Sequence, residues 1–96
     1  MANVNVKIKV NANAKKAYVC GSTKNLGEWD AKKAVAVEDG VVAKQFAAGE
    51  VVEFKVLAGK TWDKVEKGAN FEEVQNHSFV AAKGLVVEVN VENFNK

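Results

Sequence analysis

The sequence predicts an all-β fold, an immunoglobulin-like antiparallel β-sandwich of about seven strands. Three observations lead to this prediction. Eighteen of the 96 residues are valine and none is proline, apolar and polar residues alternate in several short runs, and turn signals separate these runs at short, regular spacing. Because a chain of this length supports only one core, residues 1–96 are expected to form a single domain.

The first three strands are expected on either side of one long loop. The opening run NVNVKIKV alternates with a period of two, which predicts a strand with one face in the core. A polar turn, NANAKK, leads to a second strand, AYVCG, and the loop GSTKNLGEWD follows it. The run KAVAVED alternates again and predicts the third strand.

Three turn signals in the rest of the chain predict three hairpins. Asp39-Gly40 is a strong two-residue signal, so the third strand is expected to pair with the fourth, VVAKQF. Gly49 separates FAA from the run VVEFKVL and marks a second hairpin. Lys83-Gly84 separates HSFVAA from LVVEVNVENF and marks the last one.

Residues 51–76 contain a strand and then a long loop. In the run VVEFKVL, the apolar residues at positions 52, 54 and 56 share one face, so Lys55 points to the other face. The following stretch, KTWDKVEKGANFEEVQN, loses the alternation and carries glycine, asparagine and acids. It predicts a long loop of the kind that often carries a function, with a short helical turn around residues 71–75.

The charge pattern argues against nucleic acid and membrane partners. The chain has fourteen lysines, no arginine and twelve dispersed acids, for a net charge of +2. Guanidinium groups are the preferred ligands of phosphates and base edges, and they are missing here. No apolar run approaches the roughly 18 residues that span a bilayer, and the alternating start differs from a signal peptide. The absent signal does not fix the compartment of an excised domain.

Residues that could carry catalysis are few. His77 is the sole histidine and lies at the start of an expected strand. We expect a surface or edge histidine there rather than a general base. Cys20 stands alone in a strand-like run, which predicts a buried, unreactive thiol and excludes a disulfide within the chain. We therefore expect no enzymatic activity, no metal and no cofactor.

The two tryptophans lie at loop-like positions, each followed by an acid, as Trp29-Asp30 and Trp62-Asp63. Composition alone favours a packing role, in which each ring covers an open end of the core. The functional interpretation is a platform for a flat, partly apolar ligand such as a sugar ring. The C–H face of a sugar stacks on an aromatic ring while its hydroxyls bind lysine, asparagine and acids.

Two stretches resemble a known family, and this resemblance favours the ligand-binding interpretation over the packing role. Residues 17–37, AYVCGSTKNLGEWDAKKAVAV, resemble the starch-binding domain of carbohydrate-binding module family 20, in which an aromatic residue and V-x-G-S precede L-G-x-W-[DE] and an A-V-x-L strand. Residues 46–57, FAAGEVVEFKVL, resemble that family's L-P-A-G-x-x-F-E-Y-K-F-I hairpin, with Ala47 replacing the usual proline. Both motifs occur in family order, and the similarity is weaker over residues 58–96.

The resemblance implies a non-catalytic module that binds α-glucans such as starch, glycogen or cyclodextrin. In the family, one site contains the tryptophan of L-G-x-W, the lysine of the hairpin, and a second tryptophan followed by an acid and then an asparagine. Trp29 and Lys55 match the first two residues directly. Trp62, Asp63 and Asn76 are the candidates for the other three.

The spacing of these residues departs from the family. Seven positions separate Lys55 from Trp62 and fourteen separate Trp62 from Asn76, where the family has a longer and a shorter interval. Trp62 either reaches the same place from a rebuilt loop or serves another purpose. Glu66 joins Asp63 and Asn76 as an expected partner of sugar hydroxyls.

The family's second site relies on tyrosines, and we expect that site to be absent. Asn13 takes one tyrosine position, and the Asp39-Gly40 turn deletes the loop that carries the other. The resemblance implies a monomeric accessory domain, linked to a catalytic domain in an extracellular or cell-surface protein. The competing hypothesis is a structural or protein-interaction sandwich of a larger surface or secreted protein, in which Trp29 serves for packing.

Overall fold

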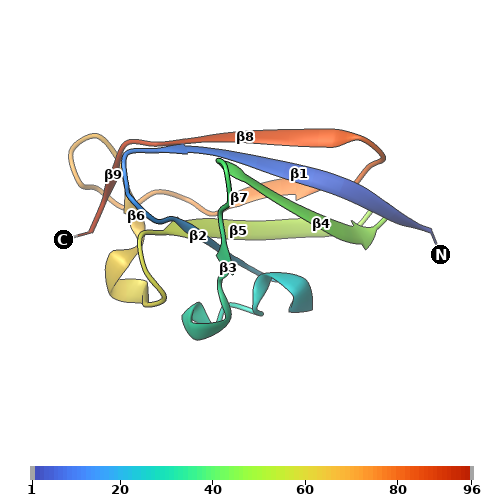
Figure 1. The fold of residues 1–96 in the computed structure, drawn as a ribbon, viewed down its shortest axis with the longest axis horizontal. Helices are drawn as coiled ribbons and strands as arrows, with labels where there is room; N and C mark the ends of the chain where they lie inside the picture. The colour runs from blue at the N-terminus through green and yellow to red at the C-terminus, as the bar shows by residue number, and fades with distance from the viewer. Residues whose placement is uncertain (1, 96) are drawn as a thin grey trace.

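The computed structural model describes residues 2–95 and consists of two β-sheets packed face to face (Figure 1). Sheet A has the order β4 (Val41–Ala47), β1 (Asn3–Ala12), β8 (Leu85–Val91). Sheet B has the order β3 (Val35–Ala36), β2 (Tyr18–Gly21), β5 (Val51–Leu57), β7 (His77–Val80). A small third sheet pairs β6 (Glu66–Lys67) with β9 (Asn93–Phe94). The predicted all-β sandwich is confirmed.

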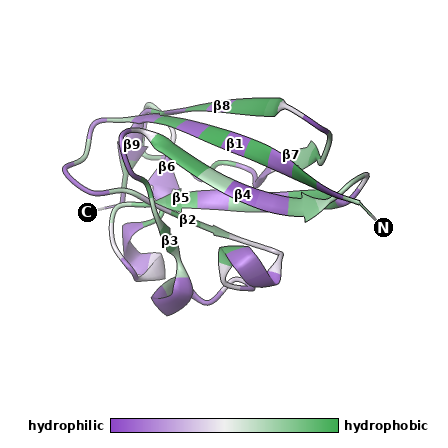
Figure 2. Cartoon of the chain, turned by 45° about the vertical axis from the view of Figure 1, so that its right-hand side comes forward, coloured by the Kyte–Doolittle hydropathy of each residue, from purple (hydrophilic) through white to green (hydrophobic). Residues whose placement is uncertain are grey.

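The alternation in the sequence places one face of each long strand in the core between the sheets. From β1, Val6 and Ile8 are fully buried, and the alternating Lys7 and Lys9 face solvent. From β5, the fully buried residues on this face are Val52, Phe54 and Val56. The banding of hydrophobic and hydrophilic residues along β1 is visible in Figure 2. The alternating pattern therefore determines which side chains fill the core.

One strand pair departs from the antiparallel arrangement of the predicted sandwich. β1 pairs antiparallel with β4, but it pairs parallel with β8, in a register that runs from Val6 opposite Leu85 to Ala12 opposite Val91. The chain reaches β8 from β7, which lies in the other sheet. Because β8 enters sheet A by this crossing, its direction is not fixed by a hairpin, and it runs alongside β1.

The three predicted turns form, but the strands on either side of each turn lie in different sheets. Asp39 and Gly40 both have positive φ, 53° and 77°, as a two-residue hairpin turn requires. Beyond this turn, β3 and β4 share only the bridge between Glu38 and Val41. The turns at Gly49 and Gly84 likewise connect one sheet to the other. Each flanking run has its own core face, so burying both faces sets the runs opposite each other across the core.

Three 3-10 turns project beyond sheet B on the side away from sheet A (Figure 1). They are η1 (Lys24–Leu26), η2 (Ala31–Lys33) and η3 (Trp62–Lys64). The expected helical turn around residues 71–75 does not form, and the helical turn of this loop is η3 instead. Within residues 2–95, no helix is long and apolar enough to cross a membrane.

The outer face of sheet B carries a second, smaller apolar cluster. Cys20 of β2 and Leu57 of β5 are fully buried there, under the η2 segment, which contributes Ala31 and Ala34. Desolvation raises the pKa of the Cys20 thiol, and the nearby negative charge of Asp30 adds to this effect. The prediction of a buried cysteine is confirmed. This cluster fixes η2 against the sheet, next to both tryptophan loops.

Candidate functional site

The loop 21–30 places Trp29 through an unusual run of backbone conformations. Gly27, Glu28 and Trp29 all have positive φ, at 89°, 49° and 65°. Glycine adopts this region freely, but Glu28 and Trp29 do not, and each costs on the order of 1 kcal/mol. Backbone hydrogen bonds hold the turn, including Trp29 N to the Gly21 carbonyl at 2.9 Å. Such strain is characteristic of functional segments, so the loop is shaped for the position of its tryptophan.

Trp62 lies against Trp29. Its segment, η3, is capped by Thr61, whose hydroxyl accepts a hydrogen bond from the Asp63 backbone at 3.3 Å. The Trp62 indole Nε1 donates to the Trp29 carbonyl at 3.1 Å, and the ring centroids are 6.1 Å apart with 39° between the ring planes. Trp62 remains 39% exposed. Two rings from distant parts of the chain therefore form one pre-formed, solvent-facing aromatic surface.

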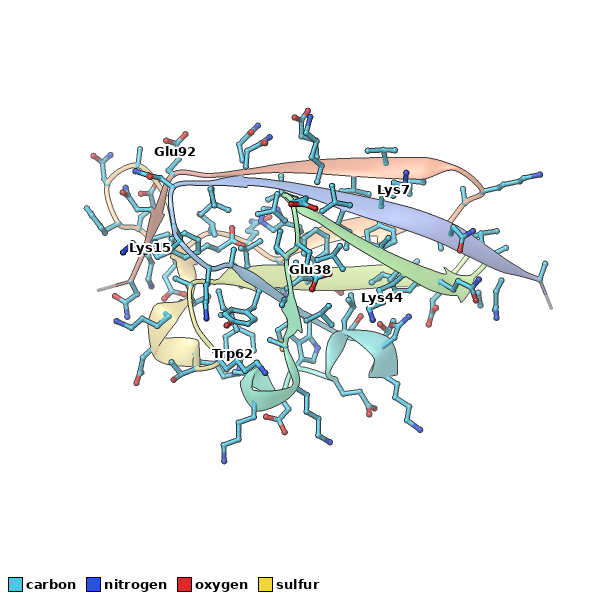
Figure 3. All side chains as sticks on the ribbon, viewed as in Figure 1. Lys7, Lys15, Glu38, Lys44, Trp62 and Glu92 are labelled. Atoms are coloured by element: carbon cyan, nitrogen blue, oxygen red, sulfur yellow. The ribbon has the colours of Figure 1, made fainter. Side chains whose placement is uncertain are left out.

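We call this surface, with the shallow depression beside it, the tryptophan platform. The depression measures about 310 Å³ and lies between the η2 and η3 segments. Figure 3 shows Trp62 on the side where the helical turns project. The lining residues are Trp29, Asp30, Ala31, Lys32, Lys60, Thr61 and Trp62.

Five of the seven residues that line the platform were not predicted as site residues from the sequence: Asp30, Ala31, Lys32, Lys60 and Thr61. Lys32, Lys60 and Thr61 have no periodic pattern or motif that marks them, and only their closeness to a tryptophan or its acid in sequence could have suggested them. The Lys60 ammonium lies 5.8 Å from the centre of the Tyr18 ring, a cation–π contact that keeps it beside the platform. Ammonium groups and the Thr61 hydroxyl can donate to sugar hydroxyls.

Lys55 and Asn76 lie on the outer face of sheet B, in a row with Cys20. Lys55 is directly opposite Cys20 in the β2–β5 register. The β5–β7 register, carried one residue past the pair of Phe54 and His77, places Asn76 next to Lys55. The Asn76 side chain donates to Glu53 Oε1 at 3.2 Å. The Trp29 backbone N–H lies close enough to the Cys20 thiol to favour its charged form, so Lys55 and Trp29 share Cys20 as a neighbour.

A charged pair lies beside this row. Lys67 Nζ binds Glu73 Oε1 at 2.8 Å. The hydrogen bond and the charge of Lys67, followed by the charge of Lys55, lower the pKa of the Glu73 carboxyl. The outer face of sheet B therefore presents both hydrogen-bond donors and acceptors near the tryptophan platform.

The two predicted acids have different environments. Asp63 follows Trp62 and is exposed, but it does not line the depression of the tryptophan platform. Glu66 is only 3% exposed, and both of its carboxylate oxygens are occupied by hydrogen bonds within the protein. The assignment of Glu66 as a sugar ligand is therefore wrong, because its side chain points into the protein rather than toward solvent.

Phe71 and Glu72 form a second aromatic–acid pair that precedes Asn76. Phe71 is 47% exposed and has a positive φ of 59°. The pair stands closer to Asn76 in sequence than Trp62 and Asp63 do. Phe71 does not line the depression beside Trp29, whereas Trp62 does. The structure thus brings together Trp29 and Trp62, and it leaves Phe71 outside the platform.

The chemical groups around the tryptophan platform suit ligand binding. Among residues 2–95 no group of three or more histidine, cysteine or acidic side chains could hold a metal ion. The ring of His77 is engaged with Glu66 at 2.7 Å. Two partly exposed aromatic rings near ammonium, amide and carboxylate groups suit a neutral ligand with one apolar face and many hydroxyls.

Comparison with protein families gives one match that spans most of the chain. The family model described as the starch binding domain matches residues 2–90. A comparison with curated proteins found no match.

Solved structures that share this fold include parts of a glucoamylase, an amylase and a cyclodextrin glucanotransferase. The structure is similar to a glycoside hydrolase family 15 glucoamylase from Hypocrea jecorina, with 20% identity and a TM-score of 0.77, covering 97% of this chain and 18% of the glucoamylase. It is similar to the family 20 module of a maltotetraose-forming amylase from Pseudomonas saccharophila, with 21% identity and a TM-score of 0.58, covering 93% and 99%. It is also similar to a γ-cyclodextrin glucanotransferase (CGTase) from Bacillus clarkii, with 21% identity and a TM-score of 0.62, covering 98% of this chain and 15% of the CGTase. These similarities confirm the fold.

Proposed function

We infer, because this chain belongs to the starch-binding domain family of carbohydrate-binding modules, that its tryptophan platform is the place where it holds an α-glucan. The family function is non-catalytic binding of α-glucans. What the proposal adds is the site and the role of each residue. Trp29 and Trp62 stack on sugar rings, Lys55 and Lys60 donate to hydroxyls, and Asp63 accepts from them.

The observation that carries this proposal is the hydrogen bond from Trp62 Nε1 to the Trp29 carbonyl. It fixes the two rings in an inclined arrangement, with 39° between their planes, before any ligand arrives. An α-glucan curves along its length, so two inclined faces can contact successive sugars that two coplanar faces would not. Pre-formed rings also lose little conformational entropy on binding.

The affinity should be modest. Each stacked ring contributes on the order of 1 kcal/mol, and the platform is open to solvent, so exposed hydrogen bonds to sugar hydroxyls add little. A dissociation constant between tens of micromolar and millimolar corresponds to about −4 to −6 kcal/mol.

The test is retardation of the protein in a native gel that contains soluble starch, compared with the same gel without starch. Titration with β-cyclodextrin should also change the tryptophan fluorescence. Trp29→Ala should abolish both responses while the circular dichroism spectrum stays that of a folded sheet protein. Val86→Ala, at an exposed apolar position on sheet A, is the control and should bind normally.

A folded Trp29→Ala variant with wild-type retardation would contradict the proposal. If the wild-type protein does not bind starch and Trp29→Ala loses roughly 3 kcal/mol or more of stability, Trp29 serves for packing and the domain is a structural or protein-interaction sandwich.

We also propose that the domain has no hydrolytic activity of its own and is joined to a catalytic domain. This chain covers 18% of the glucoamylase and 15% of the CGTase, so the comparable unit is a small part of those enzymes. A monomeric state and an extracellular or cell-surface location remain predictions. Incubation of the isolated domain with starch, followed by a reducing-sugar assay, should show no release of sugar above the buffer control.

A further inference from the structure

Glu66 is the sole buried charged side chain among residues 2–95. Its Oε2 accepts a hydrogen bond from the Val56 backbone N–H at 2.6 Å, and its Oε1 accepts one from His77 Nε2 at 2.7 Å. The His77 ring in turn packs on Phe54, with 5.2 Å between ring centroids. We call these two hydrogen bonds the Glu66 bridge. It joins β6 to both β5 and β7.

The Glu66 bridge lies where sheet B opens. The β5–β7 pairing ends at Phe54 opposite His77, while β5 itself continues to Leu57. Beyond this point β7 no longer supplies a carbonyl for the Val56 N–H, and an unpaired buried N–H costs about 1–3 kcal/mol. The Glu66 carboxylate takes the place of that carbonyl. Charge-assisted hydrogen bonds of this kind are among the strongest available to a side chain.

The segment that the bridge anchors is the one that carries Trp62. Glu66 lies four positions after Trp62. Between them, the Val65 backbone N–H donates to the Trp62 carbonyl at 3.2 Å, and Val65 forms a β-bridge with Leu57. The Ala58 backbone N–H donates to the Lys64 carbonyl at 2.9 Å and closes the loop from the other side. Except for the indole bond to Trp29, the side chain of Trp62 depends on this anchored loop for its position.

We propose that Glu66 is a positioning residue for α-glucan binding: the Glu66 bridge holds the loop of residues 58–67 so that Trp62 lies against Trp29. This inference rests on the proposed function of the tryptophan platform. Glu66 does not contact sugar, because its carboxylate is buried. It acts by fixing the separation and inclination of the two rings, and that geometry determines how well successive sugars stack.

Three variants isolate the bridge. Glu66→Ala removes both hydrogen bonds. Glu66→Gln keeps an oxygen for the Val56 N–H and an amide N–H that can donate to His77 in its other tautomer, so it should rescue. His77→Phe removes one bond but keeps an aromatic ring on Phe54. The control is Val89→Ala, which truncates a buried residue of sheet A and lowers stability away from the platform.

Two measurements, made well below the melting temperature of each variant, separate positioning from stability. The dissociation constant for β-cyclodextrin should rise about fivefold in Glu66→Ala, should rise by less in His77→Phe, and should stay within about twofold in Glu66→Gln and Val89→Ala. The near-ultraviolet circular dichroism of the two tryptophans, recorded without sugar, should change in Glu66→Ala and not in Val89→Ala.

A folded Glu66→Ala variant with the wild-type dissociation constant and wild-type tryptophan spectrum would overturn the proposal. If Glu66→Ala does not fold, His77→Phe decides by the same two readouts. If the wild-type protein binds no glucan, the proposed function fails, but the sugar-free tryptophan spectrum still reports whether Glu66 positions Trp62.

Discussion

Replacement of Trp62 by alanine tests which aromatic ring completes the tryptophan platform. The side chain is 39% exposed and donates one hydrogen bond, to the Trp29 carbonyl. A fully buried aromatic costs about 3–5 kcal/mol when truncated to alanine. Because Trp62 is partly exposed and its hydrogen bond is open to solvent, we expect Trp62→Ala to lower the free energy of unfolding by only about 1–2 kcal/mol.

Trp62→Ala should also weaken the binding of the sugar. Loss of one stacked ring removes about 1–1.5 kcal/mol of binding free energy. Since 1.4 kcal/mol corresponds to a factor of ten, the dissociation constant for β-cyclodextrin should rise about tenfold. Isothermal titration calorimetry measures this change, and urea denaturation verifies that the variant remains folded. Trp62→Phe keeps a ring and loses the indole N–H, so its dissociation constant should lie between those of wild type and Trp62→Ala.

Phe71→Ala is the matched comparison, since Phe71 is also exposed and also precedes an acid and Asn76. It should leave the dissociation constant within about twofold of wild type, because Phe71 does not line the depression beside Trp29. If Phe71→Ala loses tenfold while Trp62→Ala binds normally, the assignment of Trp62 as the second ring is refuted.

Three further predictions concern stability and reactivity. A Cβ on Gly21 would lie 2.6 Å from the Glu53 carbonyl oxygen, so Gly21→Ala should lower the free energy of unfolding by about 1–3 kcal/mol in urea denaturation, whereas Gly59→Ala, with its nearest contact at 3.4 Å, should cost less. The Cys20 thiol, with its pKa raised chiefly by desolvation, should react with a thiol reagent only after denaturant is added, and a native-state rate equal to that of a free thiol would contradict its burial. The interaction with Lys67 lowers the pKa of Glu73, so the ion pair stabilises the folded state above the ordinary glutamate pKa, and this stabilisation is lost as pH falls through the lowered pKa. The difference in melting temperature between wild type and Glu73→Gln should therefore shrink in acid. A difference that grows in acid would contradict the lowered pKa.

The alternating runs contained most of the information about the core. A strand has a period of two, so the apolar residues of NVNVKIKV and VVEFKVL had to share a face, and the structure buries Ile8 and Phe54 completely. The turn residues were also readable, because Asp39-Gly40 favours positive φ at both positions. These are local properties, and a local pattern is sufficient to predict them.

Strand pairing could not be predicted from the same patterns. A turn signal fixes the backbone for two residues, but it does not say whether the strands on either side pair or separate into opposite sheets. That choice depends on burying all core faces at once, which involves residues far apart in the sequence. The parallel pairing of β1 with β8, through a register that ends at Ala12 opposite Val91, results from this global requirement.

Part of the candidate site was predictable from the sequence, and part depended on the tertiary structure. The resemblance of L-G-x-W to the family motif identified Trp29. The sequence by itself thus determined the sheet faces, the turns and one wall of the platform. Only the tertiary structure decided that Trp62 lies against Trp29 and that Glu66, which resembled a sugar ligand, is buried between β5 and β7. The physical reason is that both positions depend on where the loop of residues 58–67 is anchored. Its anchors include Val56, His77 and Asn95, whose backbone N–H donates to the Val65 carbonyl, and only the folded protein brings these distant segments together.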